Sequence, residues 1–265
     1  MELLADQEVF LSDQARVLIW DLENTPLIGY TWGTYETDVI QISQQSHLLS
    51  FAWKWLGEKS VHVLGLNDFP QYRKDLTNDY YLVKELHSLI DQADVTIAHN
   101  GDRFDMRKAR ARFLVHNLLP PSPVKQIDTL KVARKYFSMA SNKLDDLGNV
   151  LGVGRKIDVG GFKVWLGCMA GDEKSWARMK KYNKQDVQLL EDVYLRLRPW
   201  IDGHPNLAIL NGDMDSCPRC GADAMTKQGM KRNRTTLVQQ WKCNSCGGWA
   251  SSRCAEKAPQ PSLVN

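Results

Sequence analysis

The sequence predicts an α/β fold with a mixed sheet flanked by helices, followed by a small cysteine-rich module. Residues 17–23 (VLIWDLE) form an apolar run of strand-forming residues, and three more extended segments follow before residue 67. Segments with helical periodicity then dominate up to residue 198. After residue 205 long apolar runs stop, and cysteine, glycine and basic residues dominate. We therefore expect one domain, a second small domain and a disordered tail, over residues 1–205, 213–254 and 255–265.

Length and composition are those of an ordinary soluble protein. The chain has 265 residues, of which 43% are hydrophobic and 25% charged, and its formal net charge of +3 is too small to indicate a partner. Residues 1–13 lack the basic start and apolar core of a signal peptide. No apolar stretch approaches the roughly 20 residues that span a membrane. We therefore expect a cytoplasmic protein with no membrane partner.

The strands of the first half are predicted to form an antiparallel meander. Asn24-Thr25-Pro26 ends the first strand, and residues 39–43, 47–55 and 60–66 then have the composition and alternation of strands. A short polar turn at 44–46 joins the first two of these. Consecutive strands joined by short turns pair antiparallel.

Helices and one short strand make up the rest of the first domain. The strand covers residues 94–99 and is closed by the turn pair Asn100-Gly101. Asp128 is placed to cap a helix, and Pro199 to end one. Loops are expected at the proline-rich residues 120–123 and from Gly160-Gly161 to the last helix. The predicted helices are residues 80–93, 104–117, 129–137, 143–151 and 173–198.

Four carboxylates lie at the ends of these elements. Asp21 and Glu23 are two residues apart at the end of the first strand, so both point to the same face. Two buried acids side by side repel each other unless a cation lies between them. Asp105 follows the turn after the strand at 94–99, and Asp186 shares one face of the last helix with Tyr182. The pattern indicates an acidic, metal-binding cleft.

Three motifs in this order resemble the DEDDy 3′–5′ exonucleases. These ribonuclease H-like nucleases include the proofreading domain of family B DNA polymerases. The motifs are Asp-x-Glu at 21–23, Asn-x-x-x-Phe-Asp at 100–105 and Tyr-x-x-x-Asp at 182–186. Residues 128–130 and 143–147 also resemble segments of that family. The resemblance covers residues 16–198 and implies a ribonuclease H-like mixed sheet.

The resemblance implies a catalytic role for five residues. Matched motif to motif, Asp21, Glu23, Asp105 and Asp186 would hold two Mg²⁺ or Mn²⁺ ions, and Tyr182 would hold the attacking water. Oxygen ligands favour these ions over zinc. Two ions would make a water nucleophilic and neutralise the leaving 3′-oxygen. A phenol with a pKa near 10 stays protonated at pH 7, so Tyr182 is expected to orient the water.

Other residues near the motifs have weaker expectations. In the family the matching Asn and Phe lie beside the substrate, so Asn100 and Phe104 are the expected substrate-binding residues, with Phe104 against a terminal base. Asn100 could instead only form the turn, and Phe104 could be a packing residue. Four nearby acids are expected as caps, surface or supporting residues: Asp102, Asp128, Asp145 and Asp146.

Basic residues crowd the sequence around two of the acids. Such runs are usually solvated faces, but beside an acidic cleft some should contact phosphates. One run follows Asp105 and the other precedes Asp186. Their members are Arg103, Arg107, Lys108, Arg110 and Arg112, and Lys174, Arg178, Lys180, Lys181 and Lys184.

Four cysteines in two Cys-x-x-Cys pairs resemble a zinc ribbon. Cys217 and Cys220 precede Cys243 and Cys246 by a 22-residue spacer, and residues 235–242 have the pattern of a strand. We expect one structural zinc, with Cys254 as a bystander and Cys168 as a free thiol. Basic residues and tryptophans of this module suit a nucleic-acid strand, although a folding or protein-docking role stays open: Lys227, Lys231, Arg232, Arg234, Lys242, Trp241 and Trp249.

The sequence therefore predicts a stand-alone metal-dependent 3′–5′ exonuclease that hydrolyses phosphodiester bonds at the 3′ ends of single-stranded DNA. The remaining length leaves no room for a polymerase domain, and replication or repair proteins are the expected partners. Two alternatives stay open. One is an exoribonuclease that trims RNA 3′ ends, and the other is a non-catalytic protein that binds nucleic acid through its zinc ribbon.

Overall fold

The computed structural model describes residues 14–232 and 236–252. The chain divides into two compact units, and the division falls between Ile201 and Asp202. The larger unit comprises Arg16–Ile201, and the smaller one contains the described residues from Asp202 on together with Gln14 and Ala15. Among the described residues, no helix is both long and apolar enough to cross a membrane.

The larger unit is built on a five-stranded mixed sheet. Its strands in sequence order are β1 (Val17–Asn24), β4 (Leu48–Trp55), β5 (His62–Gly65), β6 (Val95–Ala98) and β7 (Lys125–Asp128). In space the order is β5-β4-β1-β6-β7. β1 is central: it pairs antiparallel with β4 and parallel with β6. β4–β5 is antiparallel and β6–β7 parallel, which confirms the predicted mixed sheet.

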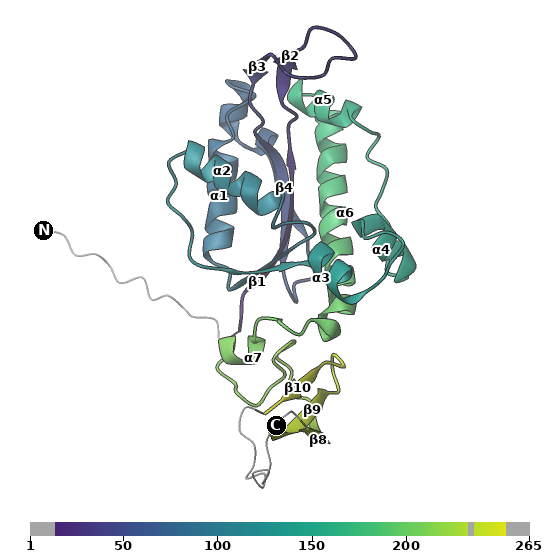
Figure 1. The fold of residues 1–265 in the computed structure, drawn as a ribbon. Coiled ribbons are helices and arrows are strands. Elements are labelled where there is room, and N and C mark those ends of the chain that lie inside the picture. Colours follow the sequence, from purple (N-terminus) through teal and green to yellow (C-terminus); the bar gives the residue numbers. More distant parts are fainter. Residues whose placement is uncertain (1–13, 233–235, 253–265) are drawn as a thin grey trace, which may run out of the picture. The chain divides into compact units, whose positions relative to one another are not determined.

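Helices cover both faces of this sheet. They are α1 (Tyr80–Asp91), α2 (Asp105–Val115), α3 (Thr129–Tyr136), α4 (Leu144–Val150), α5 (Lys163–Met169) and α6 (Glu173–Leu197), with 3₁₀ turns at Leu66–Asp68, Pro70–Arg73 and Arg198–Trp200. In Figure 1, α1 and α2 lie on one side of β1 and β4, and α6 runs along the other side.

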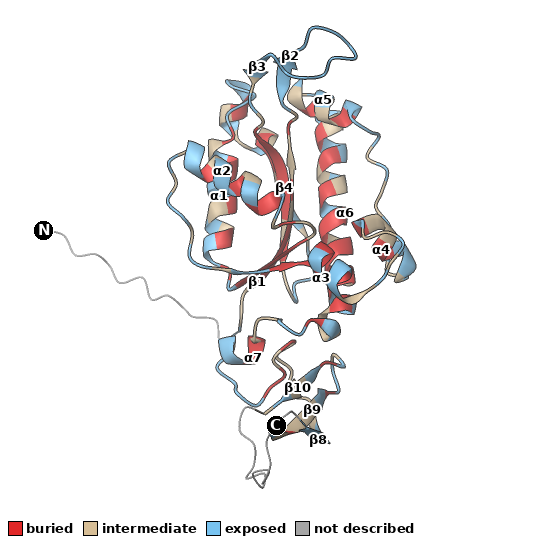
Figure 2. Ribbon diagram, viewed as in Figure 1, coloured by how far each residue is buried: buried red, intermediate tan, exposed pale blue. Residues whose placement is uncertain are grey.

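The core follows from the apolar sequence of β1. Val17, Leu18, Ile19 and Trp20 are all at most 3% exposed, although successive side chains point to opposite faces. A strand that is buried on both faces needs helices on both, and the buried residues line the inner sides of α1, α2 and α6 (Figure 2).

The predicted meander is partly wrong. The strand expected at 39–43 exists as β3 (Gln41–Gln44), but it pairs with β2 (Ile28–Tyr30) in a separate two-stranded sheet. The β2 residues are all exposed. Without a buried face, no alternation in the sequence marks this strand or its partner. β4 pairs with β5 as expected, and its other neighbour is β1.

The loop predicted at residues 120–123 is confirmed, and the unpredicted strand β7 begins after it, at Lys125. The other predicted loop contains a helix, because α5 occupies the segment before α6. Cys168 therefore lies buried in a helix, and it is a free thiol as expected. The predicted cap of α3 is confirmed, because the Asp128 side chain accepts hydrogen bonds from the backbone N–H groups of Leu130 and Lys131.

The smaller unit is a short helix and a three-stranded antiparallel sheet. The elements are α7 (Leu207–Leu210), β8 (Met225–Arg232), β9 (Leu237–Cys243) and β10 (Trp249–Ser251). β9 is the central strand, between β10 and β8, and it is the strand predicted between the cysteine pairs. β8 and β10 were not predicted. Thr235, Arg234, Cys254 and the predicted tail at 255–265 lie outside the described residues.

Candidate acidic active site and cysteine cluster

β1 carries two acids on the face that meets α6. The Asn183 side chain of α6 donates a hydrogen bond from Nδ2 to Asp21 Oδ2 at 2.9 Å. Glu23 is two residues further along the strand and points the same way. The apolar residues before Asp21 fix this end of the strand in the core, so both carboxylates are held at a defined place.

Carboxylates from distant parts of the sequence converge here. Oxygen atoms of Asp21, Glu23 and Asp186 all lie within 4.8 Å of one another. Asp105, the first residue of α2, is buried beside this group, and its Oδ1 accepts a hydrogen bond from the Leu22 N–H at 3.4 Å. The turn that brings α2 here needs Gly101, because an added Cβ would lie 2.5 Å from the Cβ of Ala98.

The cluster is short of positive charge. Burial raises the pKa of Glu23 to about 8, with the charge of Asp186 adding to the effect, and burial raises the pKa of Asp105 to about 6. The pKa of Asp21 is raised well above its ordinary value, first by burial and then by the charges of its three neighbours. Carboxyl groups with such raised pKa values hold protons when no divalent cation is bound.

Divalent ions fit these residues. The donor set consists of carboxylate oxygens, which hard cations prefer. Oδ1 of Asp186 is buried and has no hydrogen-bond partner within the described part of the chain. An ion bound between Asp21, Glu23 and Asp186 would satisfy that oxygen and offset the repulsion between the three groups.

Lys156 is a member of the site that the sequence did not predict. Its ammonium group forms an ion pair with Asp186 and donates a hydrogen bond to the Tyr182 hydroxyl oxygen at 3.0 Å. Burial alone lowers the pKa of Lys156, but the charge of Asp186 and the hydrogen bond to it raise that pKa overall. Lys156 lies in the irregular segment between α4 and α5. No periodicity marks such a segment, so no sequence signal pointed to Lys156.

Tyr182 lies beside the carboxylates, on the face of α6 that also carries Asp186. Burial and then the charge of Asp186 raise the pKa of Tyr182 above its ordinary value, so the phenol is protonated near neutral pH. The ring of Trp165 meets the Tyr182 ring at 6.3 Å between centroids, inclined by 66°.

Asn183 links three elements and was also missed. Besides its bond to Asp21, it accepts a hydrogen bond through Oδ1 from the Ser50 hydroxyl of β4 at 3.1 Å. That bond directs the amide nitrogen toward Asp21. Asn183 precedes Asp186 by three residues and so shares its helix face, a spacing that could have indicated the role.

A cleft of about 540 Å³ adjoins Glu23. Phe104 and Lys108 line it, and they belong to the turn and helix that also position Asp105. Phe162 and Trp165 line it from the segment that forms α5. The complete lining is Leu22, Glu23, Asn24, Thr25, Pro26, Phe104, Lys108, Val159, Gly161, Phe162 and Trp165.

Of the two predicted substrate-binding residues, one lines the cleft and the other forms the turn before α2. Phe104 is 55% exposed and lines the cleft, so it is no core residue. Asn100 has a positive φ of 63°, and its backbone N–H donates to Asp128 Oδ1 at 2.8 Å. Asparagine tolerates this left-handed conformation, so Asn100 forms the turn whatever else it does.

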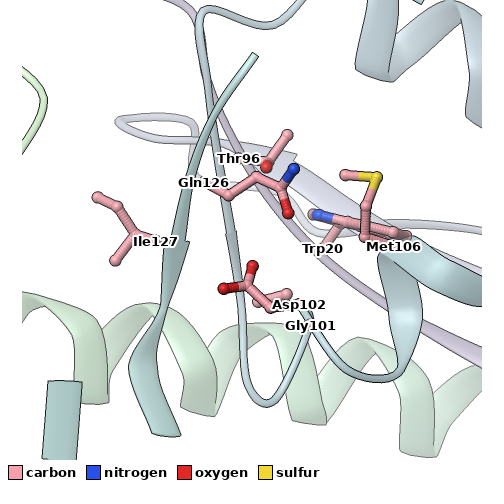
Figure 3. A pocket seen from close by; sticks show the side chains of 8 residues that line it. Trp20, Thr96, Gly101, Asp102, Met106, Gln126 and Ile127 are labelled. Carbon is pink, nitrogen blue, oxygen red and sulfur yellow. The ribbon is translucent and has the colours of Figure 1, made fainter. Parts of the chain in front are cut away.

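A second cavity near this turn is too small for a substrate. Figure 3 shows Trp20, Asp102, Met106 and Gln126 around it, and its volume is about 10 Å³. Small-molecule sites enclose roughly 300 Å³ or more. The cleft beside Glu23 is therefore the better candidate for a nucleotide.

The four nearby acids make other contacts. Asp102 forms an ion pair with Lys131, and Asp128 caps α3. Asp146 accepts a hydrogen bond from the Ser141 hydroxyl at 2.5 Å. Asp145 supports the site indirectly, because its Oδ1 accepts a hydrogen bond at 2.7 Å from the backbone N–H of Lys156.

Two residues of the basic runs are engaged in the fold. Arg112 binds the fully buried carboxylate of Asp79 through two guanidinium nitrogens, at 2.5 and 2.8 Å. Lys180 forms an ion pair with Asp68 at 2.6 Å. Lys108 instead lines the cleft, with its Nζ 5.0 Å from the centroid of the Phe104 ring.

The four paired cysteines of the smaller unit converge as a second cluster. All four sulfur atoms lie within 4.8 Å of one another, and the Cys217–Cys246 and Cys220–Cys243 separations are both 3.7 Å. Four thiolates about 2.3 Å from a tetrahedral zinc would be about 3.8 Å apart. Backbone N–H groups of Cys246 and Gly248 donate to two of the sulfurs. The cluster is thus compatible with a zinc ribbon.

Comparison with known proteins shows the family. The sequence model of the RNase_H superfamily matches residues 56–198, which is more than half of the chain. The chain belongs to the ribonuclease H superfamily. Within this superfamily match lie Asp105, Tyr182 and Asp186, whereas β1 with Asp21 and Glu23 precedes it.

A solved structure supports the ribonuclease H-like fold. The family B DNA polymerase from the hyperthermophilic archaeon Pyrobaculum calidifontis matches 84% of this chain with a TM-score of 0.51 and 13% sequence identity. The match covers 31% of the polymerase chain. No curated protein sequence matches the chain. Together, the superfamily match and this structural likeness confirm the fold that the sequence motifs predict.

Proposed function

We propose that the chain is a metal-dependent 3′–5′ exonuclease that hydrolyses phosphodiester bonds at the 3′ ends of single-stranded DNA. The observation that carries the proposal is the convergence of Asp21, Glu23 and Asp186 within 4.8 Å, with Asp105 buried beside them. Membership of the ribonuclease H superfamily supports a nuclease. The 3′ polarity rests on the resemblance of the three motifs to the DEDDy exonucleases.

In the proposed site, the four carboxylates would hold two Mg²⁺ or Mn²⁺ ions. Such ions supply a water that is nucleophilic near neutral pH and neutralise the charge that develops on the leaving 3′-oxygen. The chain holds the ligands in place through hydrogen bonds. Asn183 orients Asp21, and the Leu22 N–H orients Asp105.

Tyr182 would orient the attacking water, and a different group would take the proton of that water. Its pKa is raised, so it does not act as a base near neutral pH. Lys156 donates to the phenolic oxygen and occupies one of its lone pairs, while the Tyr182 O–H, which interacts with Asp186 here, would turn toward a water.

The cleft beside Glu23 has the dimensions and chemistry for the terminal nucleotide of a single strand. Its volume of about 540 Å³ suits one ligand of that size. Phe104, Phe162 and Trp165 line it and offer rings on which a base can stack. Lys108 is placed to contact a phosphate.

The cysteine cluster would hold one structural zinc. Four protein ligands close such a site, so the ion has no open position for a substrate. Cysteines that bind zinc must not be oxidised to disulfides, which needs a reducing compartment, and we propose the cytoplasm. Replication or repair proteins, which work at DNA 3′ ends, are the proposed protein partners.

Digestion of single-stranded oligonucleotides labelled at either end tests the proposal. With Mg²⁺, a 5′ label should give a ladder of progressively shorter products, and a 3′ label should be released at once as a mononucleotide. Asp21→Asn should slow release by about 10²–10³-fold, as expected when one group that stabilises transition-state charge is lost.

Asp102→Asn is the matched control, because Asp102 lies in the turn before Asp105 but pairs with Lys131. The Asp102→Asn variant should digest the strands at nearly the wild-type rate. An RNA strand of the same sequence tests the sugar preference, and faster digestion of RNA would overturn the choice of DNA. Unchanged digestion by Asp21→Asn would reject the site.

A further inference from the structure

The sheet of the smaller unit carries cationic side chains and no acidic ones. Residues 224–252 contain no Asp or Glu. The basic residues of β8 and β9 are Lys227, Lys231, Arg232 and Lys242. The proposed active site in the larger unit gives this concentration of charge no role.

Strand register divides these cations between the two faces of the sheet. Side chains that are paired across neighbouring strands share a face. Trp249 is paired with Lys242. Lys231 is paired with Val238, which lies four residues before Lys242 on β9 and so on the same face. Lys227 and Arg232 are paired with Trp241 and Leu237, and they occupy the opposite face.

A groove of about 440 Å³ lies on the face that carries Trp249. The volume is large enough for one nucleotide unit. Its lining is Asp202, Pro218, Arg219, Lys231, Gln240, Trp249, Ala250 and Ser251. Asp202, the acid in this lining, lies 3.6 Å from the guanidinium of Arg219, so its charge is offset.

Trp249 is held as a platform in this groove. Its side chain is 47% exposed, while Arg219, itself buried, donates a hydrogen bond from Nη1 to the Trp249 carbonyl at 2.7 Å. The Nζ of Lys242 lies 6.0 Å from the centroid of the Trp249 ring. An exposed ring on an anchored backbone, with Lys242 near the ring and Lys231 in the same groove, matches a polymer that alternates flat bases with phosphates.

We propose that this groove binds a single-stranded nucleic-acid segment, with one base stacked on Trp249 and the adjoining phosphates contacted by Lys231 and Lys242. The cationic face is complementary to a polyanion, and the Gln240 amide can pair with a base edge. The site needs no free end, so it is separate from the chemistry at Asp21.

The test uses the full chain and a circular single-stranded DNA oligonucleotide, which offers no 3′ end, in buffer without Mg²⁺. Binding is measured by fluorescence anisotropy over a range of salt concentrations. Trp249→Ala should weaken binding about tenfold, and Trp249→Phe, which keeps a ring, should bind within about twofold of wild type. A circular RNA of the same sequence reports any preference for the sugar.

Two double variants form the decisive comparison, because each removes two positive charges from the same sheet. Lys231→Ala/Lys242→Ala should reduce the slope of log affinity against log salt by about 1.4, since each phosphate contact contributes about 0.7. Lys227→Ala/Arg232→Ala should change the slope by clearly less. The zinc content of every variant is measured to establish that the unit is folded.

Equal losses in the two double variants would overturn the proposal, because the effect would then be general charge attraction. Wild-type affinity in folded Trp249→Ala would also overturn it, and would leave the face to another kind of ligand, such as an acidic protein. Exonuclease activity is read separately on linear strands, so failure of the proposed active site would not imitate either result.

Discussion

At the residue scale, the site is defined by an imbalance of charge. The carboxylates of Asp21, Glu23, Asp105 and Asp186 outnumber the ammonium groups near them in the described part of the chain, where Lys156 pairs with Asp186 and Lys108 acts on Asp105. The raised pKa values of the acids have the same origin, namely burial together with repulsion between like charges. Two consequences can be measured, one with pH and one with magnesium.

Without divalent ions, the free energy of unfolding should fall as pH rises from about 4.5 to about 8. The Glu23 carboxyl has a folded-state pKa of about 8 against an ordinary value of 4.5. Between these values the folded chain holds a proton that the unfolded chain has lost, so stability present at low pH disappears as pH rises. Urea unfolding in Mg²⁺-free buffer at pH 5, 6.5 and 8 measures the trend.

Glu23→Gln removes the titrating group and should flatten this dependence. In the wild-type chain, added Mg²⁺ should oppose the loss of stability with rising pH, because the ions bind the deprotonated carboxylates. They should stabilise the folded chain more at pH 8 than at pH 6. A wild-type chain that gains stability with pH in the absence of Mg²⁺ would contradict the charge imbalance.

Lys156 should compete with magnesium for Asp186. Its ammonium group contacts Oδ2 of the Asp186 carboxylate, whose other oxygen an ion in this cluster would take. Lys156→Gln should therefore lower the half-saturating Mg²⁺ concentration several-fold, measured by calorimetric titration. This variant should also slow hydrolysis about tenfold or more, because the Tyr182 oxygen loses its charged hydrogen-bond donor.

Lys180→Gln is the matched control for this variant. Lys180 lies on α6 and pairs with Asp68, away from the acidic cluster. The Lys180→Gln variant should leave Mg²⁺ binding unchanged. Weaker Mg²⁺ binding in Lys156→Gln would mean that Lys156 supports the ion instead of competing with it.

At the scale of elements, the sequence predicted those whose burial leaves a pattern. β1 is apolar because both its faces are buried, and α6 repeats its apolar residues at helical spacing. β2 and β3 have no buried face, so nothing in their sequence specifies their pairing. α5 has seven residues, too few to show a period, and the four-residue β7 follows prolines that indicate a loop.

The same distinction applies to the candidate site. Asp21, Glu23, Asp105 and Asp186 lie on regular elements next to motif residues, so order and spacing indicated them. Lys156 reaches Asp186, and Trp165 reaches Glu23, from the segment between α4 and α6, where the chain path depends on tertiary packing. A single sequence has no local signal for such contacts.

The joint between α1 and α2 depends on one buried charge pair. The Asp79 carboxylate, fully buried just before α1, accepts hydrogen bonds from Arg112 and from the Leu48 N–H. Asp79→Ala should lower the free energy of unfolding by about 3–5 kcal/mol, because it leaves the Arg112 charge and the Leu48 N–H without their partner.

Urea unfolding at pH 7 measures this effect against Asp91→Ala. Asp91 is exposed at the end of α1, and its loss should change the free energy of unfolding by less than about 1 kcal/mol. A loss below about 1 kcal/mol in Asp79→Ala would show that the pair adds little to the joint between the helices.

At the scale of the whole molecule, the two units are stabilised by different means. The larger unit buries a continuous apolar core on both faces of its sheet. In the smaller unit the described strands carry mostly exposed or half-buried side chains, and the sulfur atoms of the four paired cysteines lie within 4.8 Å of one another. A unit with so small a core is expected to take much of its folding free energy from zinc.

Loss of zinc should therefore unfold the smaller unit and spare the chemistry of the larger one. Cys220→Ser removes one of the four proposed ligands, so zinc content should fall well below one per chain, and the strand signal of β8–β10 in circular dichroism should decrease. Hydrolysis of a tetranucleotide, too short to depend on a second binding surface, should keep its wild-type kcat.

Cys168→Ser is the control, because Cys168 is buried in α5 and belongs to no sulfur cluster in the described residues. Equal loss of tetranucleotide hydrolysis and of zinc in Cys220→Ser would mean that the acidic site needs the folded ribbon, and the two units would then have to be treated as one catalytic body.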